Sequence, residues 1–250
     1  MDTTIIIFHN ACIDGNIETV KIFLNDKQFN INNKQNNIKN TGFHYACWYN
    51  QPIIVDFLLK KTCLEINSKN EEGMTGFHYA CFNANITIVE FLLKDARLDI
   101  NSQNNDGETG FHLACRYSRI EIVKVLLKDD RLQINSQDRR GYTPFHYACE
   151  SRYLAIVEYL LKDARLNINI ENKYSFSPFD TACLYNDYEI ILLLLNSSRL
   201  TEEIFLRKNI NNNVVKRKIS KNEKLLFSVA DGNVSDLKIL LKEKYIKIKN

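Results

Sequence analysis

Cysteines recur along this chain at a nearly constant interval, and that interval restricts the folds that the chain can adopt. Six of the seven cysteines lie 34 or 35 residues apart, at Cys12, Cys47, Cys81, Cys115, Cys149 and Cys183. All five histidines precede one of these cysteines by three residues, at His9, His44, His78, His112 and His146. A constant period of this size predicts stacked repeats rather than a fold with one central core.

One repeat, residues 104–137, shows how the pattern predicts local structure. Residues 105–107 (Asn-Asp-Gly) are typical of a turn, and Thr109 is a suitable N-cap for a short helix that reaches Cys115. A second helix is expected over residues 120–128, where apolar pairs repeat at i and i+4 and form one stripe. Because so short a helix pair cannot bury this stripe alone, we expect each repeat to stack on its neighbours.

The repeats resemble those of the ankyrin-repeat family. Residues 143–148 read Thr-Pro-Phe-His-Tyr-Ala, close to the family signature T-P-L-H-x-A, and Thr-Gly-Phe-His recurs at 41–44, 75–78 and 109–112. The second helices of the four central repeats match the family pattern I-V-x-x-L-L, and these repeats end in Ile-Asn, at 66–67, 100–101, 134–135 and 168–169. The resemblance implies an all-α ankyrin-repeat solenoid, built from helix-turn-helix units of about 34 residues with hairpin-like connecting loops.

Three departures from the family pattern carry expectations of their own. The usual period is about 33 residues, so the extra residue in segments such as 94–99 predicts a longer end of the second helix or a longer loop. Glycine replaces proline in three signatures, which is expected to soften the first helical turn. Between the two helices the family glycine is present only at Gly15 and Gly232. Another residue must therefore adopt any left-handed conformation there, and the candidates are Gln51 or its neighbour, Ala84, Ser118, Arg152 and Asn186.

The pattern predicts three regions in the chain. Residues 1–200 contain six repeats, of which the first and sixth are degenerate. Residues 201–224 form an irregular, basic, asparagine-rich insertion, and residues 225–250 form a degenerate C-terminal capping repeat. Residues 196–250 hold 13 Lys and Arg against 6 Asp and Glu, a net charge of +7. Because the whole chain carries +3, residues 1–195 carry −4. A basic end therefore follows a mildly acidic array.

The sequence favours a protein without catalytic residues or cofactors. Its eight glycines form neither a P-loop nor a G-x-G-x-x-G motif, and H-E-x-x-H and G-x-S-x-G are absent from the sequence. The repeats occupy nearly the whole chain and leave no room for a catalytic domain. An enzyme or metal protein that uses the His-x-x-Cys pairs is a further hypothesis. However, a structural zinc site needs four converging ligands, and stacked repeats place each pair in a separate layer.

The resemblance assigns the recurring histidines and cysteines structural roles. It implies that the histidines hydrogen-bond between neighbouring loops, and that the cysteines are small buried residues. Only Cys63 lies outside the period, and it is the candidate for a reactive thiol. An odd number of cysteines argues against a disulfide framework.

Neither a membrane span nor a secretory signal is expected. The longest aliphatic run, residues 190–195, is far shorter than the roughly 20 residues that a bilayer span needs. The apolar stretch at residues 5–8 is too short for the hydrophobic part of a signal peptide. We therefore expect no membrane insertion and a cytoplasmic location, with the nucleus as the alternative.

Candidate binding residues occupy positions that the fold does not need. In ankyrin-like arrays the concave surface comes from the turn tips and from the residues that follow Ala-Cys in the first helix of each repeat. Trp, Tyr and Arg, which are enriched at binding hot spots, recur there. The alternative is that the aromatic side chains fill the stack, as Tyr45, Tyr79 and Tyr147 are expected to do. The predicted partner-binding set is Trp48, Tyr49, Glu71, Glu72, Met74, Phe82, Arg116, Tyr117, Arg139, Arg140, Tyr142, Tyr174, Phe176 and Tyr185.

The sequence therefore predicts a non-catalytic scaffold or adaptor that binds an unidentified protein partner on its concave face. Aromatic anchors would desolvate the partner, while Glu71, Glu72, Arg139 and Arg140 would set its orientation. No small-molecule substrate is expected. The alternative function is binding of nucleic acid or an anionic surface through the basic residues 207–249, with an affinity that falls steeply with salt.

Overall fold

The computed structural model describes residues 3–34, 37–185, 187–197 and 199–201. The insertion predicted at 201–224, apart from Thr201, and the capping repeat predicted at 225–250 lie outside the described residues. None of the helices described is long and apolar enough to cross a membrane. Six helix pairs make up the described part: α1 (Thr3–Asp14) and α2 (Ile17–Asn25), α3 (Gly42–Trp48) and α4 (Pro52–Leu59), α5 (Gly76–Phe82) and α6 (Ile86–Leu93), α7 (Gly110–Arg116) and α8 (Ile120–Leu126), α9 (Pro144–Glu150) and α10 (Leu154–Leu160), and α11 (Pro178–Leu184) and α12 (Tyr188–Asn196).

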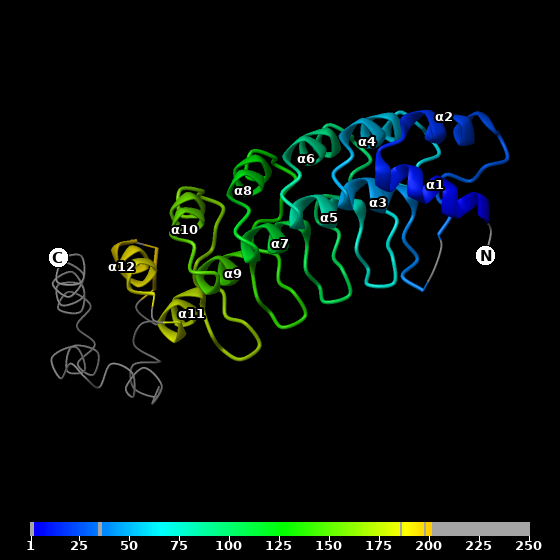
Figure 1. Cartoon of the computed structure of the whole chain (residues 1–250). Coiled ribbons are helices and arrows are strands. Elements are labelled where there is room, and N and C mark those ends of the chain that lie inside the picture. The colour runs from blue at the N-terminus through cyan, green and yellow to red at the C-terminus, as the bar shows by residue number, and fades with distance from the viewer. Residues whose placement is uncertain (1–2, 35–36, 186, 198, 202–250) are drawn as a thin grey trace, which may run out of the picture. The chain divides into compact units, whose positions relative to one another are not determined.

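The chain divides into two compact units, which are described separately. The N-terminal unit comprises residues 1–139 and holds α1 to α8, and the C-terminal unit begins at Arg140 and holds α9 to α12. In the N-terminal unit α1, α3, α5 and α7 pack side by side as an inner row, and α2, α4, α6 and α8 form an outer row (Figure 1). In the C-terminal unit α9 packs on α11, and α10 packs on α12. The predicted all-α stack of helix pairs is confirmed.

Threonine side chains start the inner helices, as the sequence predicts for Thr109. Its hydroxyl accepts a hydrogen bond from the backbone N–H of His112, and the His112 side chain accepts one in return from the backbone N–H of Thr109. This reciprocal capping box satisfies two helix-terminal donors, and it recurs at Thr41, Thr75 and Thr143. The second helix of this repeat ends at Leu126, two residues before the predicted boundary.

The apolar stripe of each outer helix supplies the core between the two rows. In α6 the side chains of Ile88, Val89 and Leu92 are completely buried. After the outer helix of the fourth repeat, alternate residues also face the core, since Leu132 and Ile134 are both buried. Because the same positions recur in each repeat, the apolar core continues from one helix pair to the next within each unit.

The loop after each outer helix is held by an arginine in several repeats. In the third repeat α6 ends at Leu93, and the chain then forms a turn in which Arg97 pairs with Asp95. The Arg97 guanidinium also donates to the backbone oxygens of Leu59, at 2.7 Å, and Lys61, at 3.0 Å, in the preceding repeat. Arg131 bonds to the Leu93 oxygen in the same way. This loop therefore ties adjacent repeats together.

Non-glycine residues adopt the left-handed conformation between the paired helices, as predicted. Ala84, Ser118 and Arg152 have φ of 60°, 59° and 59°, and Asn50, the neighbour of Gln51, has φ of 54°. Asn186, the last candidate, lies outside the described residues. A side chain with a Cβ atom is disfavoured in this region by about 1–2 kcal/mol relative to its ordinary conformation.

Replacing Ala84 with glycine is therefore expected to stabilise the fold. Ala84 is exposed and makes its turn with a positive φ, so Ala84→Gly relieves backbone strain without opening a cavity. We expect a gain of roughly 0.5–1 kcal/mol in the free energy of unfolding, measured by urea denaturation. The matched control is Ala155→Gly, at an exposed position inside α10, which should lose a similar amount. A loss of stability at both positions would contradict the strain argument.

Three glycines at the start of inner helices stand where the helices approach closely. A Cβ atom on Gly76 would lie 2.9 Å from both Cys47 Sγ and Phe43 Cε1 in the preceding helix. A Cβ on Gly110 would meet Phe77 and Cys81 in the same way, and one on Gly42 would meet Phe8 and Cys12. In the N-terminal unit these glycines therefore permit close helix packing, a role that the expected softening of the first turn does not include.

Candidate functional site

Histidines hold α3, α5 and α9 to the loop of the next repeat, and this confirms the role implied by the family resemblance. His44 Nδ1 lies 3.2 Å from the backbone N–H of Thr41, which donates to it, and its Nε2 lies 3.0 Å from the backbone oxygen of Met74. His78 has the same contacts with Thr75 and with Glu108. A ring that accepts at Nδ1 and donates at Nε2 is the neutral tautomer.

Burial keeps these rings neutral. It lowers the pKa of His44 and of His78 to about 4, against a smaller opposite effect of the hydrogen bonds to backbone oxygens. Among the described residues, no group of three or more His, Cys, Asp or Glu side chains is arranged to hold a metal ion. The imidazole nitrogens of His44 and His78 are instead committed to backbone partners.

The recurring cysteines are packed in the core, whereas Cys63 is exposed. Cys12, Cys47, Cys81, Cys115 and Cys149 are buried, which confirms their predicted role as small core residues. Burial raises the pKa of the Cys47 and Cys115 thiols well above the ordinary range, and a thiol that stays protonated is a poor nucleophile.

Alkylation of the native chain is accordingly expected to modify Cys63 first. Treatment with iodoacetamide at about pH 8 should add one group quickly, because Cys63 is exposed. Modification of the buried cysteines should require unfolding, and Cys183, which is half-buried, should react at an intermediate rate. Peptide mapping by mass spectrometry locates the groups, and Cys63→Ser should abolish the fast reaction. Fast labelling of Cys47 or Cys115 would contradict the packing described above.

Asparagine side chains shape the tips of the long loops, a feature that the sequence interpretation missed. Asn70 Oδ1 accepts hydrogen bonds from the backbone N–H groups of Glu72, at 3.0 Å, and Met74, at 2.9 Å. Asn104 and Asn172 make the equivalent contacts. The signal was present in the sequence, since asparagine or aspartate recurs there with the same period, at Asn70, Asn104, Asp138 and Asn172.

Backbone hydrogen bonds join successive tips in the N-terminal unit. The Glu71 N–H donates to the Ile38 oxygen, and the Asn105 N–H donates to the Glu72 oxygen, both at 2.9 Å. The Arg139 N–H donates to the Asp106 oxygen at 2.8 Å. The tips thus present their side chains from a connected backbone rather than from separate loops.

Four of the predicted residues form an aromatic surface at the C-terminal ends of the inner helices in the N-terminal unit. Trp48 ends α3 and Tyr49 caps it, Phe82 ends α5, and Tyr117 caps α7. Trp48, Tyr49 and Tyr117 are 42%, 51% and 40% exposed, and Phe82 is half-buried. The Phe82 and Tyr117 rings lie 4.5 Å apart in an edge-to-face arrangement. We call these four residues the aromatic surface.

Three other predicted residues of this unit have partners inside the protein. The side chain of Met74 is buried, with Asn104 Nδ2 3.5 Å from its sulfur, so it offers a partner little surface. Arg116 pairs at 2.6 Å with the buried carboxylate of Glu108, and Glu71 pairs with Lys39. Sequence position alone does not reveal these partners. Glu72, beside Glu71 at the tip before α5, is exposed and forms no ion pair with the residues that the structure describes.

The remaining predicted residues belong to the C-terminal unit, apart from the exposed Arg139 that ends the N-terminal unit. The Arg140 guanidinium lies 5.1 Å from the centre of the Tyr142 ring and donates to the Tyr147 hydroxyl at 2.6 Å. Tyr174 is 62% exposed at its tip, whereas Phe176 is half-buried. Tyr185 donates to Glu150 Oε1 at 2.6 Å, and this bond raises the pKa of Tyr185 to about 12.

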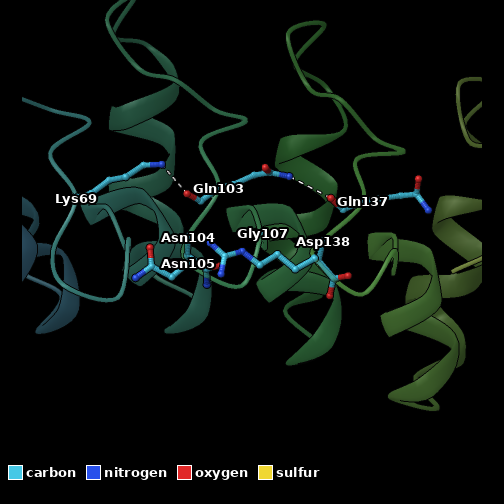
Figure 2. Close-up of a pocket in the computed structure, with 8 residues that line it drawn as sticks. Lys69, Gln103, Asn104, Asn105, Gly107, Gln137 and Asp138 are labelled. Carbon is cyan, nitrogen blue, oxygen red and sulfur yellow. Dashed lines mark hydrogen bonds between the residues drawn. The ribbon is translucent and has the colours of Figure 1, made fainter. Parts of the chain in front are cut away.

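A polar hollow of about 370 Å³ lies along the long loops of the N-terminal unit (Figure 2). Lys69 Nζ donates to the Gln103 oxygen at 2.6 Å, and Gln103 Nε2 donates to the Gln137 oxygen at 3.1 Å. Asn105 Nδ2 donates to the Glu71 oxygen at 2.7 Å. These lining donors are already used to connect one repeat to the next, so the hollow is part of the framework of the array.

Comparison with known proteins gives two matching family models, both described as ankyrin repeats. The model of three copies matches residues 77–174 and 132–208, and the model of many copies matches residues 8–59 and 54–93. A search of curated proteins gives no significant match.

Solved structures agree with this fold. The ankyrin repeat domain of Bcl-3, described as a unique member of the IkappaB protein family, aligns with a TM-score of 0.70 and 24% identity over 78% of this chain and 87% of that one. The ankyrin repeat protein EF0377 aligns with a TM-score of 0.70 and 25% identity over 78% of this chain and 98% of that one. Given these matches and the recurring capping boxes and loop contacts, the chain belongs to the ankyrin-repeat family, whose members are generally protein–protein interaction modules.

Proposed function

We propose that the protein is a non-catalytic scaffold that binds a protein partner through the aromatic surface of its N-terminal unit. The observation that supports this proposal is the exposure of Trp48, Tyr49 and Tyr117 at the ends of adjacent inner helices. Aromatic side chains supply large contact areas at a small entropic cost, and they are enriched at binding hot spots. The aromatic surface lies on the side of the repeats that the family resemblance makes concave.

Rigid support favours this role. The Trp48 ring lies 4.4 Å from the buried Tyr79 ring, and the Trp48 backbone oxygen accepts a hydrogen bond from Asn83 Nδ2 at 3.0 Å. The Phe82 backbone oxygen accepts one from Arg119 Nε at 2.8 Å. Because the ends of α3 and α5 are fixed in this way, little side-chain and backbone freedom remains to be lost on binding.

The test is capture of partners by the full chain and by two variants. Trp48→Ser/Phe82→Ser/Tyr117→Ser removes the aromatic surface, and Ile22→Ser/Ile53→Ser removes two apolar side chains that are each 69% exposed on the outer helices. We expect a partner identified by mass spectrometry to bind the wild type and the outer-helix variant but not the triple variant. Circular dichroism checks that each variant folds. Loss with the outer-helix variant, or equal capture by all three proteins, would refute the proposal.

A further inference from the structure

Two arginines show how this protein holds a guanidinium group against a tyrosine ring. In the N-terminal unit Arg116 lies 5.8 Å from the centre of the Tyr117 ring and bonds to the Glu108 carboxylate at 2.6 Å. In the C-terminal unit Arg140 lies over the Tyr142 ring and bonds to the Tyr147 hydroxyl. Each guanidinium thus has an aromatic face and an oxygen acceptor, the combination that suits its planar charge.

An aromatic ring and a carboxylate also occur together at Trp48 and Glu72, and both of these side chains are exposed. Trp48 packs against Tyr79, and the Tyr79 hydroxyl accepts a hydrogen bond from Asn70 Nδ2 at 2.8 Å. Asn70 in turn accepts from the Glu72 backbone N–H. Contacts through Tyr79 and Asn70 therefore connect the indole of Trp48 to the backbone of Glu72.

Glu72 is exposed at its loop tip and lies two residues after Asn70, whose side chain bonds to both the Tyr79 hydroxyl and the Glu72 backbone N–H. Burial raises the pKa of Tyr79 to about 12, and the negative charge of Glu72 contributes to the rise. In the described part of the chain, no cation is paired with Glu72 or stacked on Trp48, whereas the neighbouring Glu71 is paired with Lys39. Trp48 and Glu72 thus offer an aromatic face and a carboxylate, as the Arg116 site does, without an arginine from the described residues.

We propose that Trp48 and Glu72 bind an arginine side chain of the partner protein, with the guanidinium stacked on the indole and paired with the carboxylate. This inference rests on the proposed function and specifies the chemistry of the partner. Arginine fits better than lysine because its planar, weakly hydrated group can stack and pair at the same time. A partner segment that presents an arginine beside apolar residues would cover both this pair and the rest of the aromatic surface.

The probe is a set of short peptides selected from a displayed random library on the full chain. Each arginine of the selected peptides is then replaced by citrulline, which keeps the shape and removes the charge. Binding to the wild type and to every variant is followed by the fluorescence anisotropy of a dye on the peptide, and the fluorescence of Trp48, the single tryptophan of the chain, reports contact with the indole where it is present. We expect selected peptides to contain arginine, and one citrulline replacement to weaken binding about tenfold.

Two variants connect this effect to the proposed site. Glu72→Gln should weaken the arginine peptide about tenfold and leave the citrulline peptide unaffected. Glu71→Gln is the matched control on the same tip, and it should change binding less than about twofold, since Lys39 already pairs with Glu71. Agreement of both variants with these values would place the arginine at Glu72.

Other outcomes separate this inference from the proposed function. If the peptides contain no arginine, or tolerate citrulline and Glu72→Gln but lose binding to the Trp48/Phe82/Tyr117→Ser triple variant, the arginine site is wrong and the aromatic surface still binds. If the triple variant binds them as well as the wild type does, both proposals are wrong.

Discussion

Lowering the pH from about 7.5 to about 5 is expected to destabilise the protein by roughly 4 kcal/mol through His44 and His78 alone. Both rings have a pKa near 4 in the folded chain because they are buried, against about 6.5 in the unfolded chain. The unfolded state therefore binds more protons between these two values. Each ring contributes its full stabilisation above about pH 6.5, and the contribution falls by roughly 2 kcal/mol by pH 5.

Urea denaturation at a series of pH values measures this loss. His78→Gln is the matched control, since its amide can accept from the Thr75 N–H and donate to the Glu108 oxygen without titrating. The variant should be less stable at pH 7.5, but it should lose about 2 kcal/mol less than the wild type between pH 7.5 and pH 5. The ion pair with Arg97 lowers the pKa of Asp95. The contribution of this carboxylate to stability is therefore lost only at pH values below the range compared here. An equal loss in both proteins would show that His78 does not titrate as described.

Gly76→Ala is expected to destabilise the N-terminal unit by about 2 kcal/mol, although alanine favours helices by up to about 1 kcal/mol over glycine. The new Cβ atom would lie 2.9 Å from Cys47 Sγ and from Phe43 Cε1, and both of these side chains are buried. The helices must therefore move apart or the phenyl ring must leave its position, and either change disturbs the contacts between α3 and α5.

A double-mutant cycle with Cys47→Ala identifies the cause of this loss. Removing the sulfur makes room for the new methyl group, so Gly76→Ala should cost at least about 1 kcal/mol less in the Cys47→Ala background. The free energies are measured by urea denaturation of the four proteins. A stabilising effect of Gly76→Ala in the wild-type background would mean that the helix spacing adjusts freely.

The sequence predicts those features of the fold that repeat along the chain. The apolar stripes and N-cap threonines, repeated with the 34-residue period, predict the helix pairs, and the family resemblance implies the left-handed turns between them, because each depends on residues close in the sequence. The histidine contacts across repeats were available from the family resemblance. The Asn70 position could have been found in the same way, since it follows the same period.

Features that depend on side chains from neighbouring repeats were not predictable in this way. Met74, Arg116 and Glu71 stand at positions that point to a binding surface, yet each has an internal partner. The role of Gly76 also depends on how closely α3 approaches α5. Such contacts follow from the spacing and rotation of adjacent helices, which a single sequence does not specify.

The histidine contact gives the array a direction. The rings of the second, third and fifth repeats donate to a backbone oxygen of the repeat that follows, as His44 does to Met74 and His146 does to Phe176, whereas His9 bonds to the Asn33 oxygen of its own repeat. Gene duplication or loss of one whole repeat would leave every ring facing an equivalent oxygen, whereas a change of any other length would leave a buried donor unmatched. Asp180 takes the histidine position in the sixth repeat, where its carboxylate accepts from the Ser177 N–H at 2.7 Å and offers no ring donor. Within the described residues, insertion of a whole repeat therefore preserves this contact at the repeats that carry the histidine, whereas a copy of the sixth would carry an aspartate in its place.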